Sequence, residues 1–285
     1  MSIDEILNRY LFLVVENKKL KSEVKVRDVL HLLRLGANEN AIDDNFSQSP
    51  ILLIAVKHNE IDVARVLLEN GADVKGKARG GQTGLLKAVE NGDVKALNLM
   101  IEFGDSIKNY DEYLLLNEAI NKGYSYMVGR LIELGVDVNK KNGYGFTHLV
   151  SAIEKNNRLM FSLLLASGAD VNLCREKDSP LMIAVLRGDE YMIKKLIARG
   201  ANLNSKDKIG RTPLMIGVQR NRVNIVKILL ESGANMKIKD NQGDDVFCYA
   251  KDYSNKEMWD VLQEYNKKKK QSVGFNFLGL RERLC

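Results

Sequence analysis

The residues that could carry out chemistry are few and scattered along the chain. The three histidines, His31, His58 and His148, lie far apart, and no histidine or cysteine has the spacing of zinc ligands. The sequence has no phosphate-binding loop of the G-x-x-x-x-G-K-S/T or G-x-G-x-x-G type. We therefore expect no catalytic residues, no metal site and no cofactor, and we interpret the chain as a protein that is not an enzyme.

The cysteines and the apolar runs indicate a compartment. Cys174, Cys248 and Cys285 have no paired spacing, which is typical of free thiols in a reducing environment. The first residues do not form a signal peptide with a basic lead, and no run reaches the roughly 18 apolar residues of a membrane span. We expect a cytoplasmic protein without a membrane segment; the alternative is the cytoplasm of a host cell, reached without a cleaved leader.

The positive charge is concentrated at one end. The chain has 43 Lys and Arg against 37 Asp and Glu, a formal net charge of +6. Residues 267–285 alone carry a net +5, so the remaining residues are close to neutral. The basic character therefore belongs to the C-terminal tail and does not by itself predict a nucleic-acid partner.

A two-part phrase that repeats along most of the chain indicates the elements that position these residues. One part is a Ser/Thr-Pro-Leu start, and the other is an apolar run that closes at Gly-Ala, as in residues 229–234. The closing glycines recur every 31 to 35 residues and are Gly36, Gly71, Gly104, Gly135, Gly168, Gly200 and Gly233. Such a period predicts a repeat array in which each helix pair buries its apolar face on its neighbours.

The phrase and its period resemble the ankyrin repeat over about residues 26 to 265. The resemblance implies an all-α ankyrin-repeat solenoid of about eight helix pairs with β-hairpin fingers. It also implies that partners lie on the concave surface formed by the fingers and the exposed side of each first helix. The architecture is similar, too, to ankyrin proteins that intracellular bacteria deliver into host cells.

We divide the chain into four parts. Residues 1–40 are a capping helix pair, 41–238 six internal repeats, 239–266 a C-terminal capping repeat, and 267–285 a basic, flexible tail. For the tail, a docking motif and a translocation signal are the alternatives. In the first cap we expect one amphipathic helix whose apolar side consists of Ile3, Ile6, Leu7, Tyr10, Leu13 and Val14.

Local signals agree with helix pairs. Ser49, Ser179 and Thr212 each precede a proline, so we expect them to cap first helices that begin with that proline. Each predicted first helix has a small residue, Ala or Gly, at the same repeat position. The residue four positions later is always Gly or Asn, the two types that adopt the left-handed backbone conformation most readily. These positions are Asn59, Gly92, Gly123, Asn156, Gly188 and Asn221. The finger at 104–112 is shortened, so we expect its hairpin and stacking angle to differ.

Recognition of another protein, as an adaptor, scaffold or inhibitor, is the function that these features favour. The predicted finger tips are basic, with Lys75, Lys77, Arg79, Lys140, Lys141, Arg175, Lys177, Lys206 and Lys208. Two interpretations stay open: the charges solvate the fingers, or they steer an acidic partner.

Aromatic residues gather around the irregular repeat: Tyr110, Tyr113, Tyr124, Tyr126, Tyr144 and Phe146. Tyrosine is enriched in interface hot spots, although Tyr124 and Tyr126 fit helix packing equally well. The predicted partner-binding residues are Arg79, Tyr110, Tyr113, Tyr144, Phe146, Arg175 and Lys177. We predict that Tyr113→Ala or Tyr144→Ala weakens binding by more than ~1 kcal/mol without unfolding the array.

Two other functions stay open. A basic surface with stacking aromatics would suit an oligonucleotide sensor, but the only tryptophan, Trp259, lies in the terminal cap and the body is nearly neutral. The second is an ankyrin effector of an intracellular bacterium. We expect a monomer that binds another protein, with an acidic protein as one alternative, and we do not expect nucleic acid to be its partner.

Overall fold

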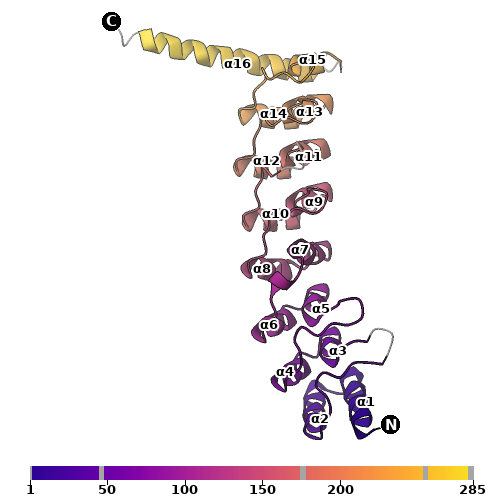
Figure 1. Ribbon diagram of the computed structural model, residues 1–285. Helices are drawn as coiled ribbons and strands as arrows, with labels where there is room; N and C mark the ends of the chain where they lie inside the picture. Colours follow the sequence, from indigo (N-terminus) through magenta and orange to yellow (C-terminus); the bar gives the residue numbers. More distant parts are fainter. Residues whose placement is uncertain (1, 45–47, 174–177, 253–255, 282–285) are drawn as a thin grey trace. The chain divides into compact units, whose positions relative to one another are not determined.

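The computed structural model describes residues 2–44, 48–173, 178–252 and 256–281, with the backbone alone from residue 269 onward. The described residues form sixteen α-helices, one short 3₁₀ helix and no named strand. The chain is therefore an all-α solenoid of helix pairs, and eight pairs confirm the expected number (Figure 1).

The helices belong to two compact units, residues 1–137 (unit 1) and 138–285 (unit 2), a division that the sequence did not indicate. Unit 1 contains α1 (Ile3–Glu16), α2 (Ser22–Arg34), α3 (Ile51–Lys57), α4 (Ile61–Glu69), α5 (Gly84–Asn91), α6 (Val94–Glu102), the 3₁₀ helix η1 (Ile107–Asn109), α7 (Glu112–Asn121) and α8 (Ser125–Glu133). Unit 2 contains α9 (His148–Glu154), α10 (Arg158–Ala166), α11 (Pro180–Arg187), α12 (Glu190–Ala198), α13 (Pro213–Gln219), α14 (Val223–Glu231), α15 (Val246–Asp252) and α16 (Lys256–Arg281).

In unit 2 the first helices of successive pairs pack on one another. α11 contacts α9 and α13, and α13 contacts α15, so these four helices form one column (Figure 1). The small residue near the middle of α11, Ala184, is fully buried, which lets neighbouring helices approach closely. The column therefore holds the exposed residues of α9, α11 and α13 side by side.

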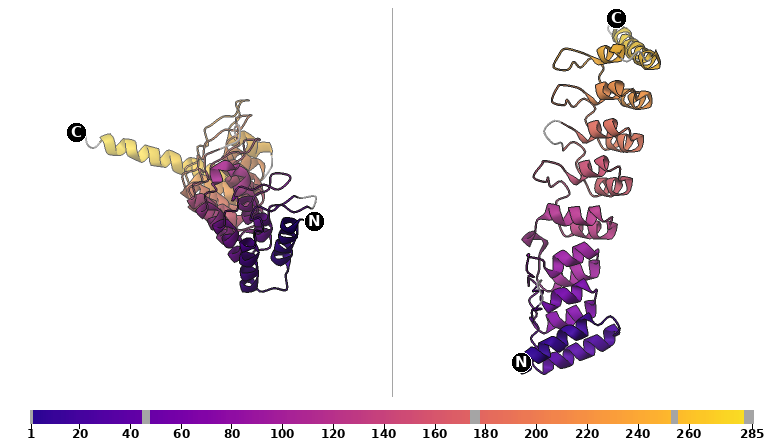
Figure 2. Two further views of the ribbon diagram at one scale, coloured as in Figure 1. Left: turned by 60° about the horizontal axis from the view of Figure 1, so that its bottom comes forward. Right: turned by 90° about the vertical axis from the view of Figure 1, so that its right-hand side faces the viewer.

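The fingers of unit 2 project from one side of this column (Figure 2). Each described finger closes through a backbone hydrogen bond, such as the one from Asp207 N–H to the Arg211 carbonyl at 3.0 Å. Within the described residues, Ile42 and Pro50 of unit 1 form an isolated antiparallel β-bridge that does not extend into a strand. The fingers are thus tight turns on hairpin-like stems rather than hairpins of regular strands.

Helix ends follow the sequence signals with one exception. The side chains of Ser179 and Thr212 accept the backbone N–H of Met182 and Met215 and cap α11 and α13, as predicted. α3 begins at Ile51 with Pro50 in the capping position, so the prediction that Ser49 caps this helix is wrong. All six predicted Gly and Asn positions have a positive φ, between 52° and 81°.

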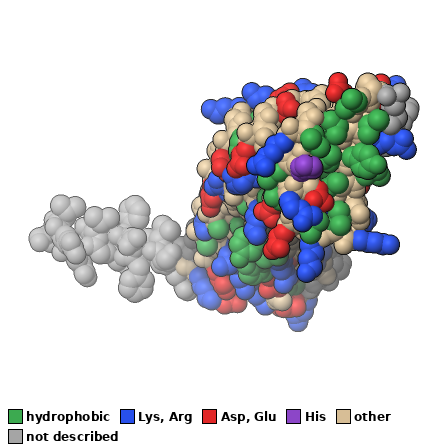
Figure 3. All heavy atoms as spheres, turned by 90° about the horizontal axis from the view of Figure 1, so that it is seen from below, with side chains coloured by type: hydrophobic (Ala, Val, Ile, Leu, Met, Phe, Trp, Pro, Cys, Tyr) green, Lys and Arg blue, Asp and Glu red, His purple; other side chains and the backbone are tan. Residues whose placement is uncertain are grey.

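The predicted apolar side of α1 is a second correction. Leu11 and Val15 are fully buried, whereas Ile3, Ile6, Tyr10 and Leu13 are 36% to 75% exposed. The helix packs on α2 and α3 through the side that carries Leu11 and Val15, because these two residues lie one turn apart on one side of the helix. Figure 3, which views this end of unit 1, shows hydrophobic side chains gathered on one part of the surface.

The last helix continues past residue 266, where we divided the capping repeat from the tail. α16 runs from Lys256 to Arg281 without a helix end near residue 266. The cap and most of the basic segment therefore share one helix, and residues 282–285 lie outside the described part of the chain.

Of the three cysteines, Cys248 is half-buried and unbonded, and Cys174 and Cys285 lie outside the described residues.

Candidate functional site

The predicted partner-binding residues are divided between the two units and the part of the chain that the structure does not describe. Arg79, Tyr110 and Tyr113 belong to unit 1, and Tyr144 and Phe146 belong to unit 2. Arg79 and Tyr144 are exposed, the latter to 76%. Arg175 and Lys177 lie outside the described residues.

Tyr110 belongs to the irregular finger and has a structural role there. Its hydroxyl donates to Oδ2 of Asp105 at 2.7 Å and lies 2.9 Å from the Thr83 hydroxyl of the preceding repeat. Burial is the main cause that raises the pKa of Tyr110 above its ordinary value; the bond to Asp105 raises it further and the bond to Thr83 opposes this. The phenol therefore stays protonated and ties two repeats together.

Asp105 explains why this finger needs no turn glycine. Its carboxylate is 4% exposed and also accepts the N–H of Ser106 at 2.7 Å and the side-chain amide of Asn109 at 3.3 Å. These bonds close the 3₁₀ helix η1, which replaces the hairpin. The hairpin of this finger is altered, as expected, and the Tyr110 hydroxyl lies at the joint between two repeats.

The other tyrosines of the aromatic cluster separate into buried and exposed groups. Tyr113 is 8% exposed, so most of its ring packs within the fold, and its role in partner binding stays a prediction. The ring of Tyr124 lies against Gly92, where an added Cβ would come within 2.7 Å of it. Tyr126 is 91% exposed on α8, so it does not contribute to helix packing.

A groove of about 580 Å³ lies on the finger side of the column in unit 2. Its apolar part comes from α11 and α13 and from the half-buried Phe146, the one predicted site residue that it includes. Leu186, on α11, is 37% exposed and offers the most open apolar contact. We call this surface the unit 2 groove; its lining residues are Phe146, Glu154, Asp178, Met182, Ile183, Leu186, Arg187, Asp207, Arg211, Ile216 and Arg220.

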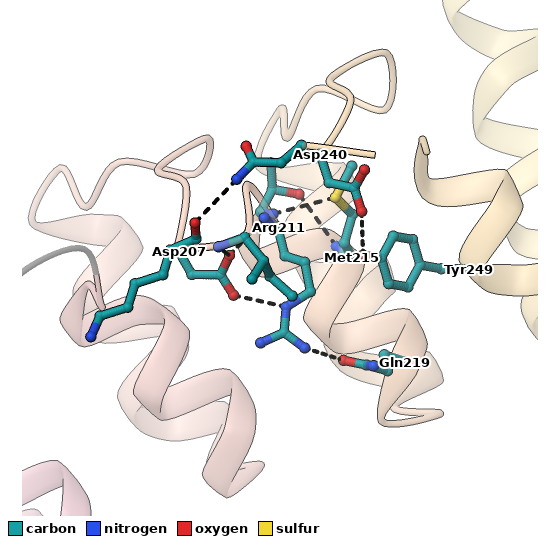
Figure 4. Close-up of polar contacts among 10 residues, drawn as sticks. Asp207, Arg211, Met215, Gln219, Asp240 and Tyr249 are labelled. Carbon is teal, nitrogen blue, oxygen red and sulfur yellow. Dashed lines mark hydrogen bonds and ion pairs between the residues drawn. The ribbon is translucent and has the colours of Figure 1, made fainter. Parts of the chain in front are cut away.

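One wall of the groove is held by a fixed ion pair. Nε of Arg211 donates to Oδ2 of Asp207 at 2.7 Å, and Nη1 donates to the Gln219 side chain at 2.7 Å (Figure 4). Oδ1 of Asp207 accepts the backbone N–H of Arg211 at 2.8 Å and of Ile209 at 3.1 Å. This network uses the hydrogen-bonding capacity of Asp207, so the wall is rigid.

The next finger is supported in a similar way. The Tyr249 hydroxyl donates to Oδ2 of Asp240 at 2.6 Å (Figure 4). That hydrogen bond is the main cause that lowers the pKa of Asp240 below its usual value, and burial is the main cause that raises the pKa of Tyr249. The pair therefore keeps its charge state near neutral pH and holds the finger against α15.

Four charged side chains of the groove form no ion pair with another described residue. Glu154, Asp178, Arg187 and Arg220 are exposed, and their side chains make no ion pair with another described residue. The two carboxylates belong to α9 and to the finger before α11, and the two guanidinium groups end α11 and follow α13. The sequence prediction missed them, although Arg187 and Arg220 are 33 residues apart at equivalent repeat positions.

The fingers of unit 2 are also joined by a ladder of asparagine side chains. Oδ1 of Asn139, Asn172 and Asn204 accepts the backbone N–H of Asp170, Asn202 and Asn235, at 2.8 to 2.9 Å. Each bond links one repeat to the next. Asn139 and Asn172 therefore have a structural role, because they join successive repeats of unit 2.

The described residues do not form a metal site or a membrane span. No group of three His, Cys, Asp or Glu side chains gathers as metal ligands in the described part of the chain. The histidines remain apart, with His31 in α2, His58 at the end of α3 and His148 buried at the start of α9. Within the same residues, no helix combines the length and apolar character needed to cross a bilayer.

Comparison with known proteins identifies the family to which this fold belongs. The chain belongs to the ankyrin-repeat family: the family described as "Ankyrin repeats (3 copies)" matches residues 20–111, 85–175, 116–207, 149–240 and 181–272. Proteins of this family are generally non-catalytic and act as protein-interaction modules.

Three relatives show how widely the repeat pattern is shared. The mouse B-cell lymphoma 3 protein homolog is 30% identical over 63% of this chain and 42% of its own length. A putative ankyrin repeat-containing protein of Treponema pallidum is 28% identical, over 64% and 65%. Chicken NF-kappa-B inhibitor alpha is 29% identical, over 57% and 52%. The chain thus spans less than two thirds of each of these relatives.

Proposed function

We propose that this chain is a non-catalytic adaptor, scaffold or inhibitor that binds its protein partner in the unit 2 groove. The observation that carries the proposal is the combination, on one surface, of an open apolar centre at Leu186 and four charged groups without an ion pair among the described residues. An interface with an apolar centre and a polar rim is the usual arrangement between proteins.

The groove suits binding because its backbone is already ordered. The asparagine ladder and the Asp207–Arg211 pair hold the fingers in place before a partner arrives. A preformed surface loses little conformational freedom on association, which favours affinity. The relative NF-kappa-B inhibitor alpha is by its name an inhibitor, which is one of the roles proposed for this chain.

The two alternative functions differ in how they fit the groove. An oligonucleotide is a polyanion, and the groove offers as many unpaired carboxylates as unpaired guanidinium groups among its described residues. This balance disfavours the oligonucleotide sensor. A bacterial effector would differ only in where it meets its partner, and the same groove would serve it.

The test uses two exposed leucines of unit 2. Leu186 lies in the groove, whereas Leu159 is 68% exposed on α10 and does not line it. We expect Leu186→Asp to release the stoichiometric partner recovered by affinity purification, with at least a tenfold loss of affinity. Leu159→Asp should retain the partner, because its side chain lies on the second helices.

Cross-linking mass spectrometry of the purified complex provides the second measurement. Cross-links from the partner should map to the fingers and first helices of unit 2. A partner that binds both leucine variants equally, or cross-links confined to α10, α12 and α14, would contradict the proposal.

A further inference from the structure

One side of α1, at the N-terminal end of unit 1, is apolar and open. Leu11 and Val15 face α2 and α3, whereas four large apolar side chains on another side of the helix stay 36% to 75% exposed. Because they are spaced by three and four residues, these side chains lie in one row along the helix. We call this row the α1 stripe; it consists of Ile3, Ile6, Tyr10 and Leu13. Hydrophobic side chains are visible at this end of unit 1 in Figure 3.

The position of α1 in the repeat stack indicates what kind of element covers the stripe. α3, the first helix of the next pair, packs between α1 and α5, and its residues from Ile51 to Val56 are all buried. α1 ends this row of first helices in unit 1 and has α3 on one side (Figure 1). A terminal repeat keeps an array soluble by turning a polar face outward. An apolar row on a terminal helix therefore favours a further helix that packs there.

Neither the undescribed residues nor a membrane fits this place. The stretches of the 285 residues that the structure does not describe are one to four residues long, too short to cover a helix of 14 residues. Helices that lie on a membrane surface are rich in Lys and Arg. α1 instead has three acidic residues, Asp4, Glu5 and Glu16, against the single basic residue Arg9. An anionic lipid surface is therefore disfavoured.

We propose that the α1 stripe is a self-association surface, and that two copies of this chain pair through antiparallel α1 helices. The stripe is symmetric along the helix, because Ile3 and Leu13 are equally far from residue 8, and so are Ile6 and Tyr10. In an antiparallel pair centred on residue 8, Ile6 of one copy lies opposite Tyr10 of the other. A two-fold dimer requires a self-complementary surface of this kind. This inference replaces the expectation of a monomer.

The side chains beside the stripe favour the antiparallel direction. With about 3.6 residues per turn, the exposed Glu5, Arg9 and Glu16 lie on one flank of the stripe. The half-buried Leu7 and Val14 lie on the other flank. Antiparallel helices related by a two-fold axis bring like flanks together, so Arg9 of each copy lies within one turn of Glu5 of the other. Parallel helices would bring the charged flank of one copy against the apolar flank of the other.

The size of the contact sets the expected affinity. An α-helix of 14 residues is about 21 Å long and about 10 Å across. One face of it is smaller than the roughly 800 Å² that each partner contributes to a standard interface. The dimer should therefore be weak, with a dissociation constant on the order of 10–100 μM.

Sedimentation equilibrium of the full chain, between about 5 and 500 μM, tests the dimer over this range of affinity. The weight-average mass should rise with concentration from that of one chain toward that of two. Ile6→Glu with Tyr10→Glu places four carboxylates at the middle of the contact and should weaken association at least about tenfold. Circular dichroism should show unchanged helical content, because both side chains are exposed. Tyr126→Glu is the matched control, since this tyrosine is 91% exposed on α8 of the same unit.

Disulfide formation tests the direction of the pair. Ile6→Cys and Tyr10→Cys are made separately in a chain whose three cysteines are replaced by serine. An equimolar mixture should form more disulfide-linked dimer than either variant alone, because Ile6 of one copy lies opposite Tyr10 of the other. Parallel helices would place each residue opposite its own counterpart, so each variant would cross-link by itself.

The outcomes are independent of the proposed function. A mass that stays constant over the whole concentration range overturns the inference, as does equal association of the double-glutamate variant and the unsubstituted chain. Binding to phosphatidylserine vesicles without self-association would assign the stripe to a membrane and overturn it too. Cross-linking no stronger in the mixture than in the separate variants overturns the antiparallel pairing. Leu186→Asp, which tests the groove of unit 2, should leave self-association unchanged.

Discussion

Two repeats, those of α5 in unit 1 and α11 in unit 2, use equivalent positions of their first helices in opposite ways. Counting from the small buried residues Ala88 and Ala184, the Gln82, Glu90 and Asn91 of unit 1 correspond to Asp178, Leu186 and Arg187 of unit 2. The Gln82 amide donates to both oxygens of Glu90 at 2.9 Å, and Asn91 donates to the Val56 carbonyl at 3.4 Å. The α5 repeat therefore bonds these side chains within the fold, whereas Asp178 and Arg187 of the α11 repeat make no ion pair with a described residue. In the α13 repeat of unit 2, Arg211 and Gln219 occupy the positions of Gln82 and Glu90 and are bonded in the same way.

The ties between successive repeats also differ between the two units. In unit 2 the asparagine ladder joins successive repeats through the backbone. In unit 1 Asn40 forms one such rung with the Asp73 N–H at 2.7 Å, but the next ladder positions are Lys75 and Lys108, and side-chain bonds around Asp105 and Glu90 take over part of the connection. Successive repeats of unit 2 are thus tied by a more regular ladder than those of unit 1.

The largest predicted effect is a difference in stability between alanine variants of two tyrosines, one from each unit. Tyr113→Ala should lower the free energy of unfolding by about 3–5 kcal/mol, because an aromatic ring that is 8% exposed leaves a cavity. Tyr144→Ala, at a ring 76% exposed, should change it by less than about 0.5 kcal/mol. Urea titration, with hydrogen exchange followed separately in peptides of each unit, measures both.

This prediction revises the expectation that either substitution leaves the array folded. If Tyr113→Ala and Tyr144→Ala unfold at the same urea concentration as the unsubstituted chain, the burial of Tyr113 has no energetic consequence.

The second prediction compares the two kinds of tie between repeats. Asp105→Ala leaves the Tyr110 hydroxyl and the Ser106 N–H without their acceptor and should lower stability by about 2–3 kcal/mol. Asn172→Ala removes one exposed rung of the ladder and should cost about 1 kcal/mol. The same urea and hydrogen-exchange measurements apply.

The control for Asp105 is Tyr110→Phe. This variant keeps the ring but deletes the hydroxyl bonded to Asp105 and Thr83, so its cost should be smaller than that of Asp105→Ala. Should Asn172→Ala prove more damaging than Asp105→Ala, the irregular finger would not be the more demanding joint, and the comparison of the units would have to be reversed.

The repeat pattern predicted the fold well because the same local backbone conformations, left-handed turns and capped helix starts, recur in each repeat. The positions of Asn59 and Gly92 need a left-handed residue in every repeat, and Ser179 and Thr212 cap their helices through a local bond. Such requirements are read from neighbouring residues alone. The side of α1 that is buried was predicted wrongly, because it depends on contacts with α2 and α3 rather than on the periodicity of α1 itself.

The candidate site was much harder to predict for the same physical reason. Residue type suggested that Tyr110 and Tyr113 are partner contacts, but type does not show whether a ring faces Asp105, the core or solvent. The groove depends on which charges remain unpaired, and that is a property of three-dimensional neighbours. Arg211 and Arg220 look alike in sequence, yet only Arg211 has Asp207 beside it among the described residues.

The smallest predicted effect concerns pH and unit 1. Burial is the main cause that lowers the pKa of His58 below its ordinary 6.5, and the neighbouring charge of Lys57 lowers it further. The unfolded chain therefore takes up this proton at a higher pH than the folded chain does. The contribution of His58 is fully present above pH 6.5 and is lost as the pH falls through the lower folded pKa.

Hydrogen exchange of peptides from α3 and α4 between pH 7.5 and pH 5, corrected for the intrinsic exchange rate, measures this loss. His58→Gln should flatten the pH dependence of their stability in this window, since glutamine does not titrate. The expected change is small because the imidazole is only partly buried. Parallel curves for the variant and the unsubstituted chain would mean that other groups cause the pH dependence, and a gain of stability toward pH 5 would reverse the sign derived from the lowered pKa.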